Sequence, residues 1–256
     1  GDWQGRVSLA ADAPDKGGNF PASSDGVGLR IPAGWTQERV HLSELDLGTA
    51  RALLMDQINR GAAIVNFFGH GGMTSMGNRG LLEADDVAAM ANDGRPTILT
   101  ALTCIIGRFE VPGFECLAES LLRKPAGGAV AVWAPSGLSQ NVLGNVLGRN
   151  FYDAVMQGGQ GILGDAILAA ARRYAAAGQP GYMLQIYNLL GDPAMVIAGF
   201  DPVYAASAGR LLSYGEWSRS RFGWDAASRP AVAGEKADPE GDGLENILEY
   251  AFGKDP

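Results

Sequence analysis

Two apolar runs rich in β-branched and aromatic residues stop abruptly at reactive side chains. Ala63–Phe68 leads into Gly69-His70-Gly71, and Thr97–Thr103 leads into Cys104. Short apolar runs with such boundaries are typical of strands buried in a parallel sheet. Because the carboxyl ends of parallel strands meet at one edge of the sheet, we expect His70 and Cys104 to lie close together.

The first two hundred residues alternate strand-like runs with runs of helical periodicity. This alternation predicts an α/β fold in which helices cover both faces of a mostly parallel sheet. The expected strands are Arg6–Ala11, Arg39–Leu42, Ala63–Phe68, Thr97–Thr103 and Ala129–Trp133, with a late strand, Ala194–Ala198, after Gly191-Asp192-Pro193. The expected helices are Leu47–Arg60, Glu83–Asn92, Glu115–Arg123, Leu143–Met156 and Asp165–Ala177.

The composition changes after Phe200, where Ala, Ser, Gly, Arg and Trp follow one another without clear periodicity. We therefore expect residues 1–199 to form one α/β domain and residues 200–256 to form a linker and a small C-terminal module. A chain of 256 residues with 46% hydrophobic content is long and apolar enough for both.

Charge and motif content argue against several classes of protein. The net charge of −8, without a dense basic tract, argues against binding to nucleic acid, and no apolar stretch is long enough to span a bilayer. Two cysteines cannot build a disulfide framework. The pattern G-x-G-x-x-G at Gly159–Gly164 follows an expected helix rather than a strand, so it predicts a connection between helices and not a dinucleotide site.

The pair of His70 and Cys104 suits nucleophilic catalysis. A thiol peptidase needs a thiolate, an acid for the leaving amine and donors for the oxyanion. The glycines beside His70 allow the backbone to approach a substrate and leave the Gly71 N–H free to bind an oxyanion together with that of Cys104. A cysteine among apolar residues is more often a core residue, as we expect for Cys116, but the position of Cys104 at a strand end favours a nucleophile.

Several segments, in their order along residues 3–198, resemble the gingipain-type cysteine peptidases of the caspase-like clan. They are Trp3–Asp12, Phe20–Asp25, Gly61–Gly71, Thr103–Phe109, Cys116–Arg123 and Leu190–Pro193. The resemblance implies a caspase-like three-layer α/β/α fold, a peptide or protein substrate, no cofactor for catalysis, and a bacterial protein that is secreted or lies at the cell surface. It also implies that Cys104 is the nucleophile and His70 the general acid and base.

Two acidic residues take on roles through this resemblance. Asp12 lies where gingipains carry a glutamate near the histidine, which implies that it orients the imidazole; as an alternative, it is a turn residue at a strand end. Asp25 matches the acid of the primary specificity pocket, which implies selection of Arg or Lys at P1, the residue before the scissile bond. Its alternative is a helix N-cap before Gly26–Ile31. Met76 and Asn141 replace aromatic residues near that pocket.

The acidic segment near the C-terminus has the spacing of a calcium loop. The six proposed ligands occupy positions 1, 3, 5, 7, 9 and 12 of an EF-hand-like loop, around Gly243 at the sharp turn. They are Asp238, Glu240, Asp242, Leu244, Asn246 and Glu249. The alternative is a solvated helix start in which Asp242 caps Leu244–Phe252.

The resulting hypothesis is a cysteine endopeptidase that cleaves after a basic residue through Cys104 and His70. One alternative is a sorting transpeptidase, in which an amine instead of water resolves the same acyl-enzyme. The other is a catalytically inactive scaffold or adhesion module at the cell surface.

Overall fold

A computed structural model describes residues 2–200, 236 and 237 of the 256-residue chain. Contacts group residues 1–200 into one compact unit. The proposed calcium ligands, Asp238 to Glu249, lie outside the described residues, so that site and the division of the chain at residue 199 stay predictions. Within the described part, none of the helices is both long and apolar enough to cross a bilayer.

The core of the fold is a six-stranded sheet with the order β2-β1-β3-β6-β7-β8. Its strands are β1 (Arg6–Ala11), β2 (Thr36–His41), β3 (Ile64–Phe68), β6 (Thr97–Leu102), β7 (Ala129–Pro135) and β8 (Tyr187–Gly191). The first five strands are parallel, and β8 is antiparallel to β7. The expected mostly parallel sheet is therefore present, with its catalytic candidates following β3 and β6.

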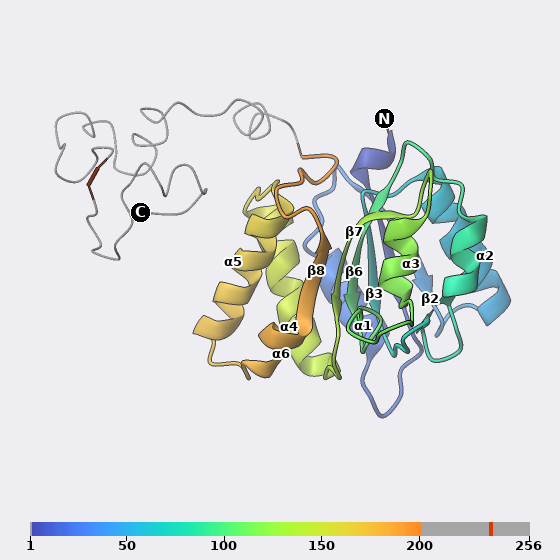
Figure 1. Ribbon diagram of the computed structural model, residues 1–256, viewed down its shortest axis with the longest axis horizontal. Coiled ribbons are helices and arrows are strands. Elements are labelled where there is room, and N and C mark those ends of the chain that lie inside the picture. The colour runs from blue at the N-terminus through green and yellow to red at the C-terminus, as the bar shows by residue number, and fades with distance from the viewer. Residues whose placement is uncertain (1, 201–235, 238–256) are drawn as a thin grey trace. The chain divides into compact units, whose positions relative to one another are not determined.

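Helices cover both faces of this sheet (Figure 1). One face carries α1 (Phe20–Gly28), α4 (Asn141–Tyr152) and α5 (Leu163–Ala176), and the other carries α2 (Leu47–Arg60) and α3 (Leu117–Arg123). Short elements complete the fold: η1 (Asp2–Gly5), β4 (Ser75–Met76), β5 (Leu82–Glu83), the 3₁₀ helix η2 (Ala84–Ala89), the π-helix η3 (Asp153–Gln157) and α6 (Tyr182–Ile186). The three layers agree with the expected α/β/α architecture.

Successive residues of each central strand contribute to the two cores in turn. In β3, Ile64 and Phe68 pack among the buried residues beneath α1 and α4, whereas Val65 and Phe67 pack beneath α2 and α3. A strand with helices on both faces must be apolar at nearly every position, because successive side chains point to opposite faces. This requirement explains the continuous apolar run that identified the strand in the sequence.

The helix α2 shows why some sequence-based boundaries are correct. The Asp46 carboxylate accepts a hydrogen bond from the Thr49 N–H at 3.0 Å, which caps the first turn. Gly61 follows the last residue with φ of 95°, a conformation that glycine adopts without steric cost. The expected range Leu47–Arg60 is therefore confirmed.

Other expected elements differ from the structure. The late strand was predicted after Gly191-Asp192-Pro193, but β8 precedes that turn, and 194–198 contains only an isolated bridge between Ile162 and Val196. The expected helix Glu83–Asn92 is a short 3₁₀ helix whose N-terminus is closed by Glu83 and Asp86. The helix expected over 143–156 begins earlier and changes to a π-helix at Asp153.

Candidate active site

His70 and Cys104 line one open cleft of about 360 Å³ at the carboxyl edge of the sheet. Loops that follow β1, β3, β6 and β7 form its wall, as expected for a ligand site of a parallel sheet. The loop after β1 contributes Gly17, and α1 contributes Phe20. The loops after β3 and β6 contribute Gly69, His70, Thr103 and Cys104, and the loop after β7 with the start of α4 contributes the run Ser139 to Val142. The structure thus brings the two predicted catalytic residues together.

Gly71 allows the histidine and cysteine loops to touch. A Cβ atom at this position would lie 2.4 Å from the Cys104 carbonyl oxygen, 2.6 Å from Thr103 Oγ1 and 2.8 Å from Ile106 Cγ2. All three distances are shorter than any ordinary contact of a Cβ atom, and one partner is backbone that cannot rotate away. Only glycine fits between the loops, so this residue sets how closely His70 approaches the cysteine.

The imidazole of His70 has a carboxylate partner that the sequence did not indicate. Nε2 lies 2.8 Å from Asp15 Oδ2, and about two fifths of each side chain is exposed (40% and 39%). The ring also packs edge-on against Phe20, with ring centroids 5.1 Å apart and planes at 72°. A carboxylate on one ring nitrogen fixes the orientation of the imidazole.

A tight turn presents this carboxylate. Asp15 and Gly18 exchange two backbone hydrogen bonds of 3.1 and 3.2 Å, and Asp15 Oδ1 accepts from the Gly17 N–H at 2.7 Å. The Gly17 N–H, followed by the hydrogen bond with His70, holds the pKa of Asp15 below its usual value. Gly17 also lies against the imidazole, because a Cβ there would be 2.9 Å from His70 Cε1. The pattern Asp-x-Gly-Gly is the only sequence signal for this turn.

Asp12 supports His70 through the backbone and not through the ring. Its Oδ2 accepts hydrogen bonds from the backbone N–H groups of His70 at 2.8 Å and of Asn78 at 3.0 Å. Burial raises the pKa of this carboxyl, and the two N–H donors oppose that rise. The contact with the imidazole that the resemblance implied is made by Asp15 instead, so Asp12 holds the loop on which the histidine is carried.

The sulfur of Cys104 lies in a fixed polar environment. Sγ accepts from the Ser139 N–H at 3.4 Å and lies 3.5 Å from the Ser139 carbonyl oxygen. Ser139 Oγ is in turn 3.1 Å from the hydroxyl of Tyr187, the first residue of β8. Tyr187 is buried, which raises the pKa of its phenol and keeps it neutral. The strand β8 therefore fixes the loop that contacts the sulfur.

The backbone after Cys104 turns sharply. Ile105 has φ of 36°, which is unusual for a β-branched residue, and the Ile106 N–H returns to the Cys104 carbonyl oxygen at 2.6 Å. Strained backbone of this kind is concentrated at functional sites in proteins. The turn ends β6 and leaves Cys104 partly exposed.

Two backbone donors near the sulfur lack acceptors. Gly71 and Met76 are opposite each other in an isolated β-bridge. The two hydrogen bonds of this bridge run from the Gly77 N–H to the His70 carbonyl and from the Gly72 N–H to the Ser75 carbonyl, so the Gly71 N–H takes part in neither. Among the hydrogen bonds of the described residues, the Gly71 and Cys104 N–H groups donate none. Both are free to bind an anionic oxygen.

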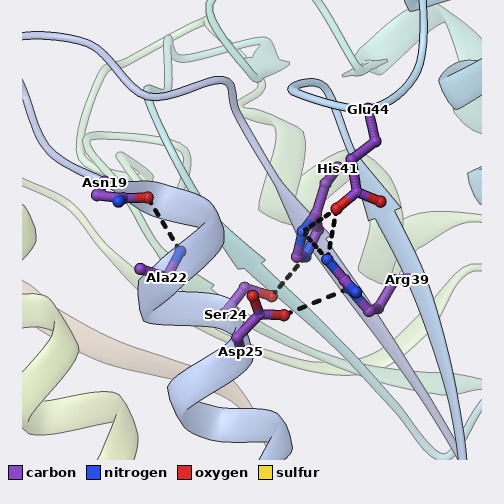
Figure 2. A network of polar contacts seen from close by, with 7 residues as sticks. All are labelled: Asn19, Ala22, Ser24, Asp25, Arg39, His41 and Glu44. Carbon is purple, nitrogen blue, oxygen red and sulfur yellow. Dashed lines mark hydrogen bonds and ion pairs between the residues drawn. The ribbon is translucent and has the colours of Figure 1, made fainter.

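Asp25 does not line the cleft, contrary to the expected specificity pocket. Figure 2 shows its carboxylate directed towards Arg39, and the ion pair measures 3.3 Å with half of the Asp25 side chain exposed. It lies inside α1, whose N-cap is Asn19, so the alternative expectation of an N-cap is also wrong. Burial and Arg39 lower the pKa of the neighbouring His41, which is hydrogen-bonded to Ser24 and has a structural role.

Cys116 lies in the core, as expected, and does not line the cleft. Cys116 is fully buried at the start of α3, and burial raises the pKa of its thiol to about 11. Of the predicted pocket neighbours, Met76 is also buried, whereas Asn141 lines the cleft. Within residues 2–200, no group of three or more His, Cys, Asp or Glu side chains is arranged to hold a metal ion.

The chain is similar to two known bacterial proteins over part of its length. Gingipain R2 and gingipain R1 of Porphyromonas gingivalis are each 23% identical to the chain over 169 residues, which are 61% of this chain but 22% and 17% of those proteins. The chain thus spans less than a quarter of these relatives.

Solved structures show the same fold. A crystal structure of the Arg-specific cysteine proteinase gingipain R matches 77% of this chain and 48% of its own, with a TM-score of 0.66 and 18% identity. The complex of the pro- and mature domains of RgpB from Porphyromonas gingivalis matches 77% and 49%, with a TM-score of 0.66 and 17% identity. The expected caspase-like fold is confirmed. Because the model of peptidase family C25 matches residues 1–198, which include the whole cleft, the chain belongs to that family.

Proposed function

We propose that the protein is a cysteine endopeptidase in which Cys104 and His70 act as nucleophile and acid–base. His70 takes the thiol proton, and Cys104 Sγ attacks the peptide carbonyl carbon. The oxyanion forms between the Gly71 and Cys104 N–H groups, and the C–N bond breaks as His70 protonates the leaving amine. Water then attacks the thioester, His70 accepts its proton, and the acid product leaves with the thiol restored.

The observation that carries this proposal is the shared cleft. Cys104 and His70 line the same cavity, and the imidazole has an acidic partner at 2.8 Å. Such a chain of nucleophile, base and orienting acid defines hydrolases of this kind irrespective of fold. Membership of peptidase family C25 supports the same reaction.

Replacement of the two central residues tests the reaction. Cys104→Ala should abolish hydrolysis of a fluorogenic peptide library, and Asp15→Asn should lower kcat/KM by about a hundredfold or more because the imidazole loses its orienting acid. Asp153→Asn is the matched control, because Asp153 lies on η3 and forms an ion pair with Arg30. This variant should retain activity. Hydrolysis that persists in the Cys104→Ala protein would reject the mechanism.

The two alternatives have separate tests. A transpeptidase would transfer the acyl group to an added amine such as hydroxylamine or a glycine peptide in preference to water, which mass spectrometry of the products detects. An inactive scaffold would leave Cys104 unmodified by a peptide-based alkylator. The partial exposure of Cys104 and the N–H donors of Gly71 and Cys104, which have no acceptor among the described residues, favour the peptidase over the scaffold.

A preference for Arg or Lys at P1 and a location outside the cell are finer parts of the hypothesis. The basic preference is supported by the similarity to gingipains R and to a structure described as Arg specific. The residue expected to carry it, Asp25, is paired with Arg39 away from the cleft. A library that varies only P1 measures this preference directly.

A further inference from the structure

The junction between α1 and β2 contains a buried histidine. His41, the last residue of β2, is 1% exposed and contacts α1 (Figure 2). Its Nε2 is 3.2 Å from Ser24 Oγ on α1, and its Nδ1 is 3.2 Å from Nη2 of Arg39 on the same strand. The proposed reaction does not use this titratable side chain.

The contact with Arg39 fixes the protonation state of the His41 ring. A guanidinium group has only N–H donors, so Nδ1 of His41 must accept and carries no hydrogen. The single N–H of the neutral imidazole is therefore on Nε2, which donates it to Ser24 Oγ. This arrangement requires a neutral ring, because a second proton on Nδ1 would place two donors and two positive charges 3.2 Å apart.

One cation and two carboxylates lie around this ring. Arg39 also pairs with Asp25 of α1 at 3.3 Å and with Glu44, in the turn after β2, at 2.6 Å. Glu44 Oε1 is 4.0 Å from Nδ1, beyond hydrogen-bond distance, and both carboxylates are about half exposed, whereas the His41 side chain is fully buried. On the neighbouring strand, β1, the residues of this face are apolar: Val7, Leu9 and Ala11. Burial and then Arg39 lower the pKa of His41, and the two carboxylates do not offset that decrease. We use the name His41 junction for the five polar residues, Ser24, Asp25, Arg39, His41 and Glu44.

The helix α1 depends on its contacts to stay helical. It has nine residues, and the four in its middle, Ser23-Ser24-Asp25-Gly26, are weak helix formers. Polar links hold it on two sides. Ser24 and Asp25 contact β2, and Ser23 Oγ accepts a hydrogen bond from Asn145 of α4 at 2.9 Å. The His41 junction is therefore one of the two polar anchors of a helix with little stability of its own.

The same helix reaches the cleft at its other end. Its first residue, Phe20, lines the cleft and packs against the imidazole of His70, with ring centroids 5.1 Å apart. The turn that presents Asp15 to His70 comes directly before the helix. We propose that the His41 junction is a pH-sensitive clamp: neutral His41 holds α1 on β2, and protonation of His41 in mild acid loosens α1 and, with it, the Phe20 side of the cleft.

The direction of the pH dependence follows from the number of bound protons. In the loosened state His41 binds a proton with its ordinary pKa of 6.5, whereas the clamped ring excludes that proton. The clamp is therefore complete above this pKa and is lost as the pH falls below it. The equilibrium constant for loosening should rise by up to about tenfold per pH unit until the clamped ring is itself protonated. This behaviour goes beyond the proposed peptidase activity, and its test needs no substrate.

Amide hydrogen exchange of the full chain between pH 7.5 and pH 5 tests the clamp, after correction for the intrinsic effect of pH on the exchange rate. The α1 amides should exchange faster by about tenfold or more at the lower pH, and those of α5 should keep their corrected rates. His41→Gln retains an acceptor for Arg39 and a donor for Ser24 but does not titrate, so it should remove the pH dependence of α1.

His70→Gln is the matched control, because it replaces the only other histidine of the chain and should retain the pH dependence of α1. A corrected exchange rate of wild-type α1 that does not change with pH would overturn the proposal. The wild-type pH dependence in the His41→Gln protein would also overturn it.

Nuclear magnetic resonance of the imidazole nitrogens gives a second readout, which does not depend on the folding of the His41 variant. The chain has two histidines, so His70→Gln assigns the signals of His41. At pH 7.5 the hydrogen of His41 should be on Nε2. Arg39→Met, at a side chain that is 46% exposed, should raise the pH at which His41 titrates, because the guanidinium no longer opposes the proton. A hydrogen on Nδ1 at pH 7.5, or an unchanged titration in the Arg39→Met protein, would refute the clamp.

Discussion

Gly71→Ala gives a quantitative test of the contact between the histidine and cysteine loops. The new methyl group would lie 2.4 Å from the Cys104 carbonyl oxygen, and ordinary contact begins at 3.4 Å, so the loops must separate by about 1 Å. Overpacking of this size costs about 1–3 kcal/mol of unfolding free energy. A displacement of about 1 Å between reacting groups lowers the rate by about a hundredfold. A hundredfold loss corresponds to about 2.7 kcal/mol, so we expect the losses of kcat/KM and of stability to be of similar size.

The measurement combines urea unfolding with kcat/KM for the best peptide of the P1 library. Gly72→Ala is the control, because the nearest atom to its Cβ is Ser75 Oγ at 3.0 Å, the end of a small side chain that can rotate away. Its stability and rate should remain close to the wild-type values. If Gly71→Ala kept both the wild-type rate and the wild-type unfolding free energy, the inferred tight contact between the two loops would be refuted.

Three further predictions concern the cysteines, Asp12 and the acidic segment. At pH 7.5, iodoacetamide should modify Cys104 and leave Cys116 unmodified, because burial raises the pKa of the Cys116 thiol to about 11. Peptide mapping of the alkylated protein measures this, and modification of native Cys116 would contradict the prediction. Burial raises the pKa of Asp12 above its usual value of 3.8 in the folded state, so the contribution of Asp12 to the unfolding free energy should fall as the pH rises through the raised pKa. Asp12→Asn should lack this pH dependence of the unfolding free energy in urea titrations. Calorimetry should show that calcium binds the segment from Asp238 to Glu249 with a dissociation constant in the millimolar range, and EGTA should remove the bound calcium. Glu249→Gln should weaken calcium binding; equal binding by that variant would exclude the proposed loop.

The sequence predicted the parts of the site that follow buried central strands. β1, β3 and β6 are covered on both faces, so their apolar runs are continuous, and the residues after β3 and β6 include His70 and Cys104. β8 is an edge strand with three half-exposed residues in the middle, and its alternation is too weak to separate it from the following turn. The late strand was therefore predicted seven residues too far along the chain.

The residues that the sequence did not place depend on loop geometry. Asp15 and His70 are 55 residues apart in the sequence. They form a hydrogen bond only because the turn from Asp15 to Gly18 folds back onto the imidazole ring of His70. α1 contains Ser23, Ser24, Asp25 and Gly26, which are weak helix formers, and the structure begins it with the Asn19 cap and Pro21 in the first turn. Once this segment is helical, Asp25 is carried to the exposed side, a position that matching along the sequence cannot reveal.

The antiparallel edge strand has a consequence for the order in which the cleft is assembled. A nascent chain that ends after α5 already contains the thiol, the imidazole and their acidic neighbours, yet it lacks Tyr187 and the Ile186 carbonyl that anchor Ser139 and Ser136. Closing that anchor joins segments about fifty residues apart, a late event in a chain synthesised from its N-terminus. The loop that contacts the sulfur is thus fixed only after the chain has been synthesised through β8.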